Sequence, residues 1–292
     1  MQEDDIIYKL IKFKGRKIMS FKNPDTSKIS DKKLYIFDMD GTIYLGDNVF
    51  NFAIRFINNL RAAGKRVLFF TNNASHSDDF YIEKLTKLGF SPSREEIMTS
   101  GDVTKVFLHR KRSGKSVYLV GTDDLVNDFK KDGIKLVDGN SESADIVITS
   151  FDTTLTYKKL NDACRLVRNG SEYLSTHPDF NCPTETGFIP DSGAIAAFVT
   201  ASTGKIPTYF GKPYIETLEM ICEHTGIAKE DMCIFGDRLY TDIALGARNG
   251  VMSILVLTGE TTAEDVKNAD KKDQPNYVFD SLDDVDKLMF SK

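Results

Sequence analysis

Apolar segments with two different spacings alternate along the chain from about residue 33. Residues 33–37 and 66–70 are short, nearly continuous apolar runs, which is the pattern of strands buried on both faces of a parallel sheet. Between them, residues 53–63 repeat apolar side chains at helical spacing, and Gly64 ends that pattern. The same alternation continues to the end of the chain. It predicts an α/β fold in which helices cover both faces of a parallel sheet.

The same criteria predict the remaining elements. Strands are expected at residues 97–99, 117–120, 136–137, 146–149, 172–176, 208–210, 231–235, 253–257 and 276–279. Helices are expected at residues 77–88, 102–110, near 124, and at 156–168, 192–202, 215–222, 240–248 and 282–289. Residues 177–191 contain three prolines and are expected to form a loop, because proline interrupts both kinds of pattern.

The order of these elements predicts that one α/β unit is inserted into another. A Ser-Gly linker at residues 113–114 interrupts the first pattern, which resumes at residue 208 after a further set of strands and helices. We therefore expect a core domain formed by residues 31–100 and 206–292 and a second domain formed by residues 101–205.

Residues 1–30 precede this pattern and are expected to be an N-terminal extension. The first 18 residues are polar with scattered lysines, and they lack the apolar segment of a signal peptide. We expect residues 1–18 to be dispensable, with a short helix at residues 6–11 as the alternative.

The bulk composition excludes several classes of protein. A chain of 292 residues is long enough for about two domains. Its net charge of −5 provides no basic surface for nucleic acid, and no apolar run approaches the ~20 residues of a membrane-spanning helix. The four cysteines match no zinc or redox spacing. Because nothing indicates an oxidising compartment, we expect a cytoplasmic protein.

Two aspartates one residue apart follow the first predicted strand. Residues 36–42 read Ile-Phe-Asp-Met-Asp-Gly-Thr, so Asp38 and Asp40 stand at the carboxyl end of that strand. Open α/β sheets bind ligands at this edge. Carboxylates suit a hard cation such as Mg²⁺, and one of them can act as a nucleophile that forms an acyl phosphate. The alternative is a polar turn, since aspartate and glycine both favour turns.

Three further predicted strands end in polar residues. These residues are Thr71, Asn72 and Asn73 after one strand, Lys212 after another, and Asp237 with Asp242 after a third. Each group has an ordinary explanation by itself: a turn, a loop before a helix or a helix N-cap. In a single parallel sheet, however, the carboxyl ends of all four strands lie along one edge. We therefore interpret the four groups as parts of one site.

The residue types of this site match the parts of a phosphoryl-transfer reaction. Asp38 is predicted to attack phosphorus, and Asp40 to protonate the leaving group and then activate water. Asp237 is predicted to complete a Mg²⁺ site together with Asp38 and the backbone carbonyl of Asp40. Thr71 and Lys212 are predicted to bind the phosphate oxygens.

The same residues resemble the motifs of the haloacid dehalogenase-like (HAD) hydrolase superfamily. Asp38-Met-Asp-Gly-Thr is similar to its first motif, Thr71-Asn72-Asn73 to the second, Lys212 in Phe-Gly-Lys-Pro to the third, and Gly236-Asp237 through Thr241-Asp242 to the fourth. The extension Thr42-Ile-Tyr-Leu-Gly and the Thr-Asn-Asn form resemble subfamily IIA, which includes NagD-like, p-nitrophenyl phosphatase-like and pyridoxal phosphatase-like enzymes. The resemblance extends over nearly the whole chain from about residue 33. It implies a Rossmann-like parallel-sheet core with an inserted α/β cap domain of the C2 type.

One position departs from the family pattern. The family usually has Asn-Pro-Asp where this chain has His177-Pro178-Asp179. His177 is predicted either to contact the substrate from the cap domain or to be a loop histidine with a structural hydrogen bond.

The function predicted from these observations is that of a Mg²⁺-dependent phosphatase. Its substrate is expected to be a small phosphate monoester, such as a sugar phosphate, a nucleotide or a similar metabolite, and its intermediate an aspartyl-phosphate. The alternatives are a phosphotransferase with the same intermediate, a receiver-like regulatory domain and a catalytically silent binding module. A homodimer is left open, and no nucleic acid or membrane is expected as a partner.

The predicted site residues fall into three groups. They are Asp38, Asp40, Thr71 and Lys212 for catalysis, Asn72, Asn73 and His177 for substrate binding, and Asp38, Asp40, Asp237 and Asp242 for the metal, where Asp242 orients metal-bound water or Lys212.

Overall fold

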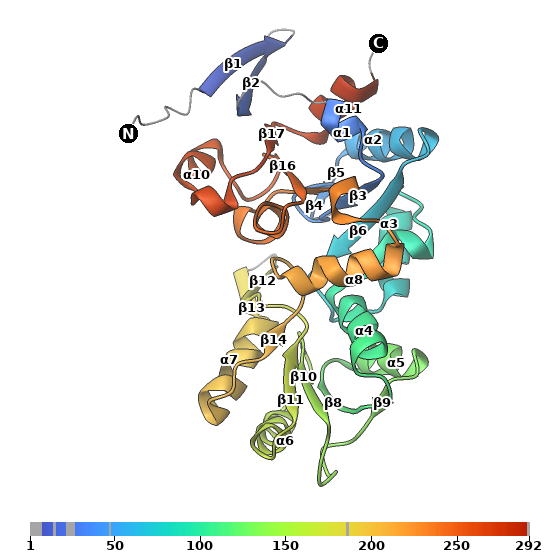
Figure 1. Cartoon of the computed structure of the whole chain (residues 1–292), viewed down its shortest axis with the longest axis vertical. Coiled ribbons are helices and arrows are strands. Elements are labelled where there is room, and N and C mark those ends of the chain that lie inside the picture. Colours follow the sequence, from blue (N-terminus) through green and yellow to red (C-terminus); the bar gives the residue numbers. More distant parts are fainter. Residues whose placement is uncertain (1–7, 14–15, 22–26, 47, 185–186, 291–292) are drawn as a thin grey trace. The chain divides into compact units, whose positions relative to one another are not determined.

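The structure of the chain falls into two compact units (Figure 1). It is a computed structural model that describes residues 8–13, 16–21, 27–46, 48–184 and 187–290. The first unit holds the described residues up to 70, residues 85–96 and the residues from 226 onward, and the second unit holds residues 71–84 and 97–225. The domain boundaries expected at 100/101 and 205/206 stay a prediction, and we describe each unit by itself.

A parallel sheet forms the centre of the first unit. Its strands lie in the order β17 (Tyr277–Phe279), β16 (Met252–Val256), β15 (Met232–Gly236), β3 (Leu34–Phe37) and β6 (Arg66–Thr71). All of these neighbouring pairs are parallel, as the alternating pattern predicts. β3 lies between β6, which follows it in the chain, and β15, which comes much later. The strand order therefore reverses at β3, and sheets of this kind bind ligands at such a point.

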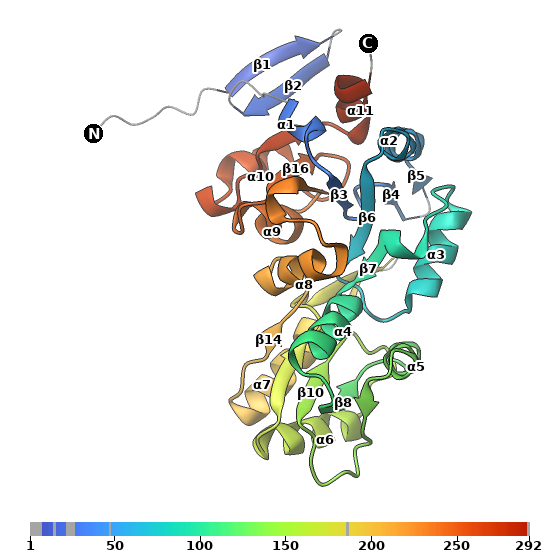
Figure 2. The same cartoon turned by 45° about the vertical axis from the view of Figure 1, so that its right-hand side comes forward.

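Two helices cover one face of this sheet, α2 (Asn51–Ala62) and α11 (Leu282–Phe290) (Figure 2). The ring of Phe56 on α2 meets the ring of Phe37 on β3 edge-on, at 5.9 Å between centroids, and that of Phe235 on β15 at 5.8 Å. These aromatic contacts fix α2 over the two central strands.

The opposite face is covered by the chain that follows β15. Ile254 is the partner of Phe235 in the sheet, so the next residue, Leu255, points to the other face. There Leu255 packs in an apolar cluster with Ile243, from the turn after β15, and with Val266 from α10 (Ala263–Asn268). The described residues thus bury both faces of the sheet, and a ligand would bind at the ends of its strands.

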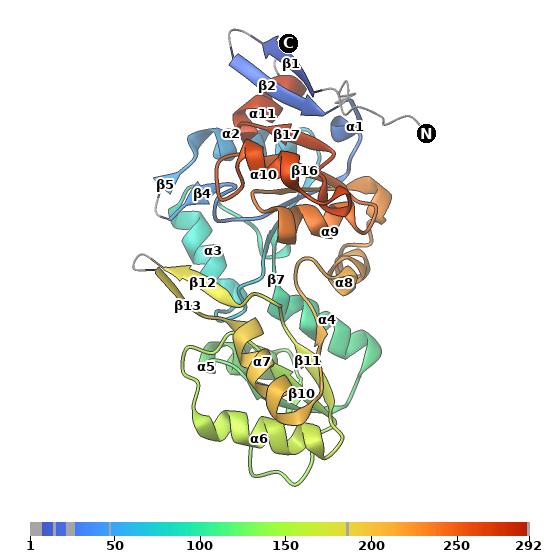
Figure 3. The same cartoon turned by 90° about the vertical axis from the view of Figure 1, so that its left-hand side faces the viewer.

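The second unit is built around its own parallel sheet. Its strands lie in the order β14 (Thr208–Tyr209), β11 (Glu172–Ser175), β10 (Ile146–Thr149), β8 (Ser116–Val120) and β9 (Lys135–Leu136). Helices α6 (Tyr157–Arg168) and α7 (Ser192–Thr203) lie side by side against β10 and β11 (Figure 3). Leu166, Val147 and Val199 belong to the apolar cluster that joins them to the sheet.

The remaining elements are the sixth strand of the first sheet, β7, which follows β6 in the strand order, and elements that are shorter or lie outside the two sheets. They are α1 (Ser27–Ser30), β4 (Tyr44–Leu45), β5 (Asn48–Val49), α3 (Asp78–Lys87), β7 (Ile97–Thr99), α4 (Ser100–Lys111), α5 (Asp123–Lys131), α8 (Ile215–Thr225) and α9 (Ala244–Ala247). Helix α10 was not predicted from the sequence.

The placement of the strand before Lys212 corrects a prediction. The sequence led us to expect residues 208–210 in the same sheet as the strands that precede Asp38, Thr71 and Asp237. Instead β14 pairs with β11, in the sheet of the second unit. A two-residue strand carries too little pattern to specify its sheet, so spacing alone could not have placed it.

Two antiparallel hairpins lie where the sequence led us to expect a loop or a helix. Residues 177–191 were expected to be a loop, yet β12 (Asn181–Thr184) and β13 (Gly187–Pro190) pair as an antiparallel hairpin. A two-stranded ribbon tolerates proline because each strand has an unpaired edge. Near the N-terminus, β1 (Tyr8–Phe13) and β2 (Arg16–Phe21) also pair as an antiparallel hairpin. The alternative of a helix at residues 6–11 is therefore wrong for residues 8–11. Residues 6 and 7 lie outside the described residues.

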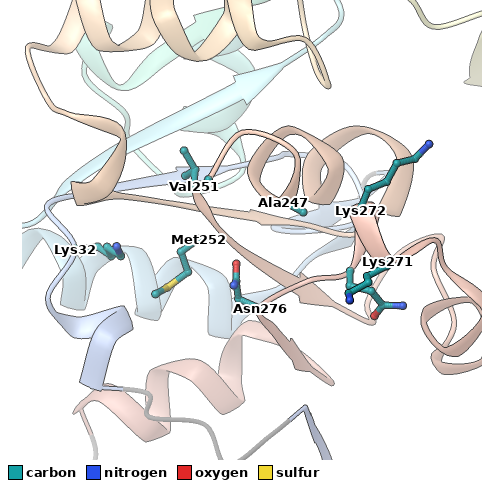
Figure 4. A pocket seen from close by; sticks show the side chains of 9 residues that line it. Lys32, Ala247, Val251, Met252, Lys271, Lys272 and Asn276 are labelled. Atoms are coloured by element: carbon teal, nitrogen blue, oxygen red, sulfur yellow. The ribbon is translucent and has the colours of Figure 1, made fainter. Parts of the chain in front are cut away.

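A hollow of about 350 Å³ lies at the amino ends of the strands of the first unit (Figure 4). Its lining includes Lys32, which precedes β3, Met252, which begins β16, and Asn276, which precedes β17. The candidate site was predicted at the carboxyl ends of these strands, so this hollow is separate from it.

None of the helices in the described part of the chain is both long enough and apolar enough to cross a membrane.

Candidate active site

Three carboxylates meet at the carboxyl edge of the first unit's sheet. Asp38 directly follows β3 and Asp237 directly follows β15, and these strands are neighbours in which Phe37 is paired with Phe235. The backbone N–H of Asp38 donates to the carbonyl of Phe235 at 2.9 Å, which extends the ladder to the site. Asp242 comes from the π-helical turn Leu239–Ile243. One carboxylate oxygen from each of the three aspartates lies within 4.8 Å of the other two.

Glycines give the carboxylates the room to approach one another. A Cβ atom on Gly41 or on Gly259 would overlap the Asp237 carboxylate, and a Cβ atom on Gly236 would overlap the side chain of Asp242. Gly41 also has a φ of +86°, a conformation that other residues rarely adopt. The glycine after Asp38-Met-Asp is therefore required both by its backbone conformation and by the packing of Asp237.

Asp237 is the most confined of the three carboxylates. It is 1% exposed. Its Oδ2 accepts a hydrogen bond from the backbone N–H of Glu260 at 2.7 Å, whereas its buried Oδ1 has no hydrogen-bond partner among the described residues. Burial, together with the neighbouring charges of Asp38 and Asp242, raises the pKa of Asp237 to about 8. The cluster therefore needs a positive partner to hold all three charges at neutral pH.

A hard divalent cation fits this cluster. Carboxylate oxygens are the ligands that Mg²⁺ prefers, and Oδ1 of Asp237 is a buried acceptor with no donor among the described residues. The sequence also allowed Asp237 to be the N-cap of a helix. In the structure the N-cap of the following turn is Arg238 instead. The sequence prediction that Asp38, Asp237 and Asp242 lie together agrees with this geometry.

Arg238 and Glu260 are neighbours of the cluster that sequence reasoning missed. Burial of the Arg238 guanidinium lowers its pKa, but the charges of Asp38 and Asp237 outweigh this effect and raise it overall. Arg238 Nε lies 3.0 Å from Glu260 Oε2, and the Tyr240 hydroxyl donates to the same carboxylate at 2.9 Å. The segment Thr258-Gly259-Glu260 follows β16, so the rule that polar residues mark strand ends could have found it.

Asp40 lies outside the buried part of this cluster. Its side chain is exposed, and its backbone forms a bridge with Tyr44 in the turn that follows β3. An exposed carboxylate at this edge can exchange protons with solvent. The roles predicted for Asp40, in proton transfer and through its carbonyl in metal binding, stay predictions.

Asn72 makes most of its contacts with the backbone of Lys212. Its Oδ1 accepts from the Lys212 backbone N–H at 2.7 Å, and its Nδ2 donates to the Lys212 carbonyl at 3.0 Å and to Asp179 Oδ2 at 3.1 Å. Asn72 is 7% exposed. Because Asn72 directly follows β6, these bonds tie the Lys212 backbone to the chain just beyond the end of that strand.

The other residues of this segment make local contacts. Thr71 Oγ1 accepts from the backbone N–H of Asn73 at 3.1 Å. Asn73 Oδ1 accepts from the backbone N–H of Ser75 at 2.9 Å and from its hydroxyl at 2.7 Å. These bonds shape the turn after β6, and substrate binding by Asn73 stays a prediction.

His177 is wholly buried in the second unit. Its Nε2 lies 2.8 Å from Asp191 Oδ1, and its Nδ1 lies 3.0 Å from Thr176 Oγ1 and 3.3 Å from Ser100 Oγ. The ring has 0% exposure, which leaves no surface for a substrate. This geometry corresponds to the structural alternative, and the substrate contact stays an untested prediction. Nothing in the local sequence specified the partner, because Asp191 is 14 residues away.

Comparisons with known proteins agree with this geometry. The model of the haloacid dehalogenase-like hydrolase family matches residues 35–135, and a second model, described as HAD-hydrolase-like, matches residues 209–285. An acid sugar phosphatase of Staphylococcus aureus is 36% identical over 253 residues, which cover 87% of this chain and 96% of that protein.

Solved structures of phosphatases are also similar to this chain. A 4-nitrophenylphosphatase from Thermotoga maritima has a TM-score of 0.84 and 40% sequence identity, over 90% of this chain and 99% of its own. A p-nitrophenyl phosphatase from Archaeoglobus fulgidus has a TM-score of 0.82 and 28% identity, over 88% of this chain and 99% of its own.

The glycine packing around Asp237 predicts that a single methyl group weakens cation binding. In Gly259→Ala the new Cβ displaces the Asp237 carboxylate, and we expect the affinity for Mg²⁺ to fall roughly tenfold or more, as when an outer-shell partner is lost. Titration calorimetry of the metal-free protein measures this. The control is Gly114→Ala, where nothing lies within 4 Å of the new Cβ and where the positive φ of +74° lowers the stability of the fold without crowding a carboxylate. Equal Mg²⁺ affinities in the two variants would contradict the packing argument.

The buried His177–Asp191 pair predicts a dependence of stability on pH. Burial lowers the pKa of His177, but the Asp191 carboxylate outweighs burial and raises it above the usual 6.5. A raised pKa stabilises the fold below pH 6.5, and this contribution is lost as the pH rises through the folded-state pKa. Loss of one partner of a buried pair costs about 3 kcal/mol or more, so His177→Gln should lower the free energy of unfolding most at acidic pH.

Denaturant unfolding at several pH values tests this dependence. The difference between wild type and His177→Gln should shrink as the pH rises from 6 to 9. The exposed His224 on α8 supplies the control variant His224→Gln. A difference for His177→Gln that is the same at every pH would show that the pair does not carry this charge.

Proposed function

The chain belongs to the haloacid dehalogenase-like hydrolase family, among its NagD-like and p-nitrophenyl phosphatase-like members, and we propose that it hydrolyses small phosphate monoesters with Mg²⁺ as its cofactor. As a member of this family it is a hydrolase of phosphoric monoester bonds. The observation that carries the proposal is the cluster of Asp38, Asp237 and Asp242 at the carboxyl edge of the sheet.

Asp38 is the proposed nucleophile. It stands at the end of β3, the strand at which the sheet order reverses, and its backbone is fixed by the hydrogen bond to Phe235. Its carboxylate attacks the phosphorus of the ester, and the bond to the leaving oxygen breaks. The product of this step is an aspartyl-phosphate at Asp38.

Asp40 moves the proton in both halves of the proposed reaction. In the first half its carboxylic acid protonates the leaving alkoxide, and in the second half its carboxylate takes a proton from the water that attacks the aspartyl-phosphate. Its exposure to solvent supports this exchange. Release of inorganic phosphate regenerates the carboxylate of Asp38.

Thr71 and Lys212 are the proposed phosphate-binding residues. Thr71 is the last residue of β6, the strand beside β3. The backbone of Lys212 is tied to the next residue, Asn72, which supports a position for the lysine near this strand end. A hydroxyl and an ammonium group stabilise the charge that the phosphoryl oxygens carry during transfer.

Asp38, Asp237 and Asp242 are the residues that would hold Mg²⁺, joined by the backbone carbonyl of Asp40. When bound, the cation supplies positive charge that reduces the repulsion between the attacking carboxylate and the phosphate. The chain's own contribution is to hold the three carboxylates within reach of a single ion.

Sugar phosphates are the first substrates to test. The relatives act, by their names, on sugar phosphates and on an aryl phosphate. We extend only the shared chemistry, a small phosphorylated metabolite, to this chain. A cytoplasmic location and a homodimer stay predictions.

Replacement of the proposed nucleophile tests this function. Asp38→Asn keeps the size of the side chain and removes its charge, and we expect kcat for p-nitrophenyl phosphate with Mg²⁺ to fall at least ~10³-fold, as for loss of a nucleophile. Released nitrophenol is measured at saturating substrate.

The control for this variant is Asp79→Asn, which removes one carboxylate charge from the exposed start of α3. Turnover in the control should match wild type. Wild-type turnover in Asp38→Asn would refute the assignment of the nucleophile.

A further inference from the structure

The side chain of Asn72 has no N–H donor left for the phosphate of a substrate. An amide side chain offers two N–H donors and one carbonyl oxygen. Both donors are used, by the Lys212 carbonyl and by Asp179 Oδ2, and the oxygen accepts from the Lys212 N–H. Donation to a phosphate oxygen, the substrate contact that the sequence suggested, would require Asn72 to break a bond that it makes while 7% exposed.

These bonds hold Lys212 by both of its backbone polar groups. The N–H and the carbonyl of one residue are both paired with one amide side chain, which fixes the position and the rotation of that backbone unit. A lysine side chain has a long flexible stem, so the placement of its charge depends on where its Cα lies. Fixing the Lys212 backbone therefore limits where its ammonium group can go.

Gly211, the residue before Lys212, is also packed closely against Asn72. Gly211 has a φ of +75°, and a Cβ atom built on it would lie 2.8 Å from Asn72 Oδ1 and 2.8 Å from the Cβ of His177. Thr217 Oγ1 donates to the Gly211 carbonyl at 2.7 Å. The segment is thus held by contacts on both sides, and Asn72 is the contact that reaches Lys212 itself.

Asn72 is in turn held by the buried histidine network. Ser100 Oγ donates to the Asn72 carbonyl at 2.5 Å and lies 3.3 Å from His177 Nδ1, and His177 Nε2 is paired with Asp191 at 2.8 Å. All of these residues belong to the second unit. A network whose members are buried and satisfied is rigid, which suits a support for a functional residue.

We propose that Asn72 is a positioning residue that fixes the backbone of Lys212, with Ser100 and the His177–Asp191 pair as its support. This inference rests on the proposed function, in which Lys212 binds the phosphate. It replaces the predicted substrate contacts of Asn72 and His177 with an indirect role through Lys212.

A double-mutant cycle tests this inference. Lys212→Ala should lower kcat/KM for p-nitrophenyl phosphate ~10²- to 10³-fold, the usual cost of losing one group that stabilises transition-state charge. Asn72→Ala should lower it ~10- to 10²-fold, as expected for a misplaced group. In the double variant the loss should equal that of Lys212→Ala alone, because Asn72 has no lysine left to position.

Inhibition by inorganic phosphate gives a second readout that a merely structural role would not move. The inhibition constant should rise in both Asn72→Ala and Lys212→Ala. The matched control is Asn59→Ala on α2, which removes the hydrogen bond from a partly buried amide to Asp286 in the first unit. This control should lose stability without a change in kcat/KM or in phosphate inhibition.

The outcomes separate the inference from the proposed function. Wild-type kcat/KM in Asn72→Ala, or a loss in the double variant equal to the product of the two single losses, overturns the positioning role while Lys212 keeps its own. Wild-type kcat/KM in Lys212→Ala removes the proposed role of the lysine and the inference with it. If Asn72→Ala does not fold, Ser100→Ala should lower kcat/KM about fivefold by loss of one supporting hydrogen bond, and no change there overturns the inference.

Discussion

Mutual repulsion among Asp38, Asp237 and Asp242 is the constraint on which the rest of the site depends. Three carboxylates within 4.8 Å of one another, two of them almost fully buried, do not remain charged together without a positive partner. The pairing of β3 with β15 brings two of them together, and glycines at 41, 236 and 259 leave the space. The fold therefore maintains an arrangement that is unfavourable by itself and becomes favourable when a cation binds.

The parallel sheet and its carboxylate edge could be predicted from the sequence because they follow from strong, local signals. Continuous apolar runs predicted β3, β6 and β15, and the residues directly after them needed only the rule that parallel strands share an edge. The rule failed for Lys212, whose two-residue strand β14 joins the other sheet. Its link to the chain after β6 comes instead from a side chain, Asn72, and periodicity contains no information on such a bond.

The two residues for which we propose a different role, Asn72 and His177, are connected through Ser100. Both stand in motifs that resemble those of a known family, and both were first assigned to the substrate because polar residues in such motifs usually touch it. Burial separates the two roles, since His177 is wholly buried and Asn72 is only 7% exposed. A motif thus indicates that a residue matters to a site, whereas only the hydrogen-bond partners indicate whether it acts on the substrate or through a neighbour.

The central claim is that the three-carboxylate cluster is a divalent cation site. Titration calorimetry of Mg²⁺ into the metal-free protein, with wild type and Asp237→Asn compared at pH 8, tests it most directly. The account predicts a single class of Mg²⁺ site in wild type. In Asp237→Asn the affinity for Mg²⁺ should fall by more than the roughly 10- to 100-fold that follows loss of an outer-shell partner. Equal affinity in the two proteins, or no binding to wild type, would contradict it.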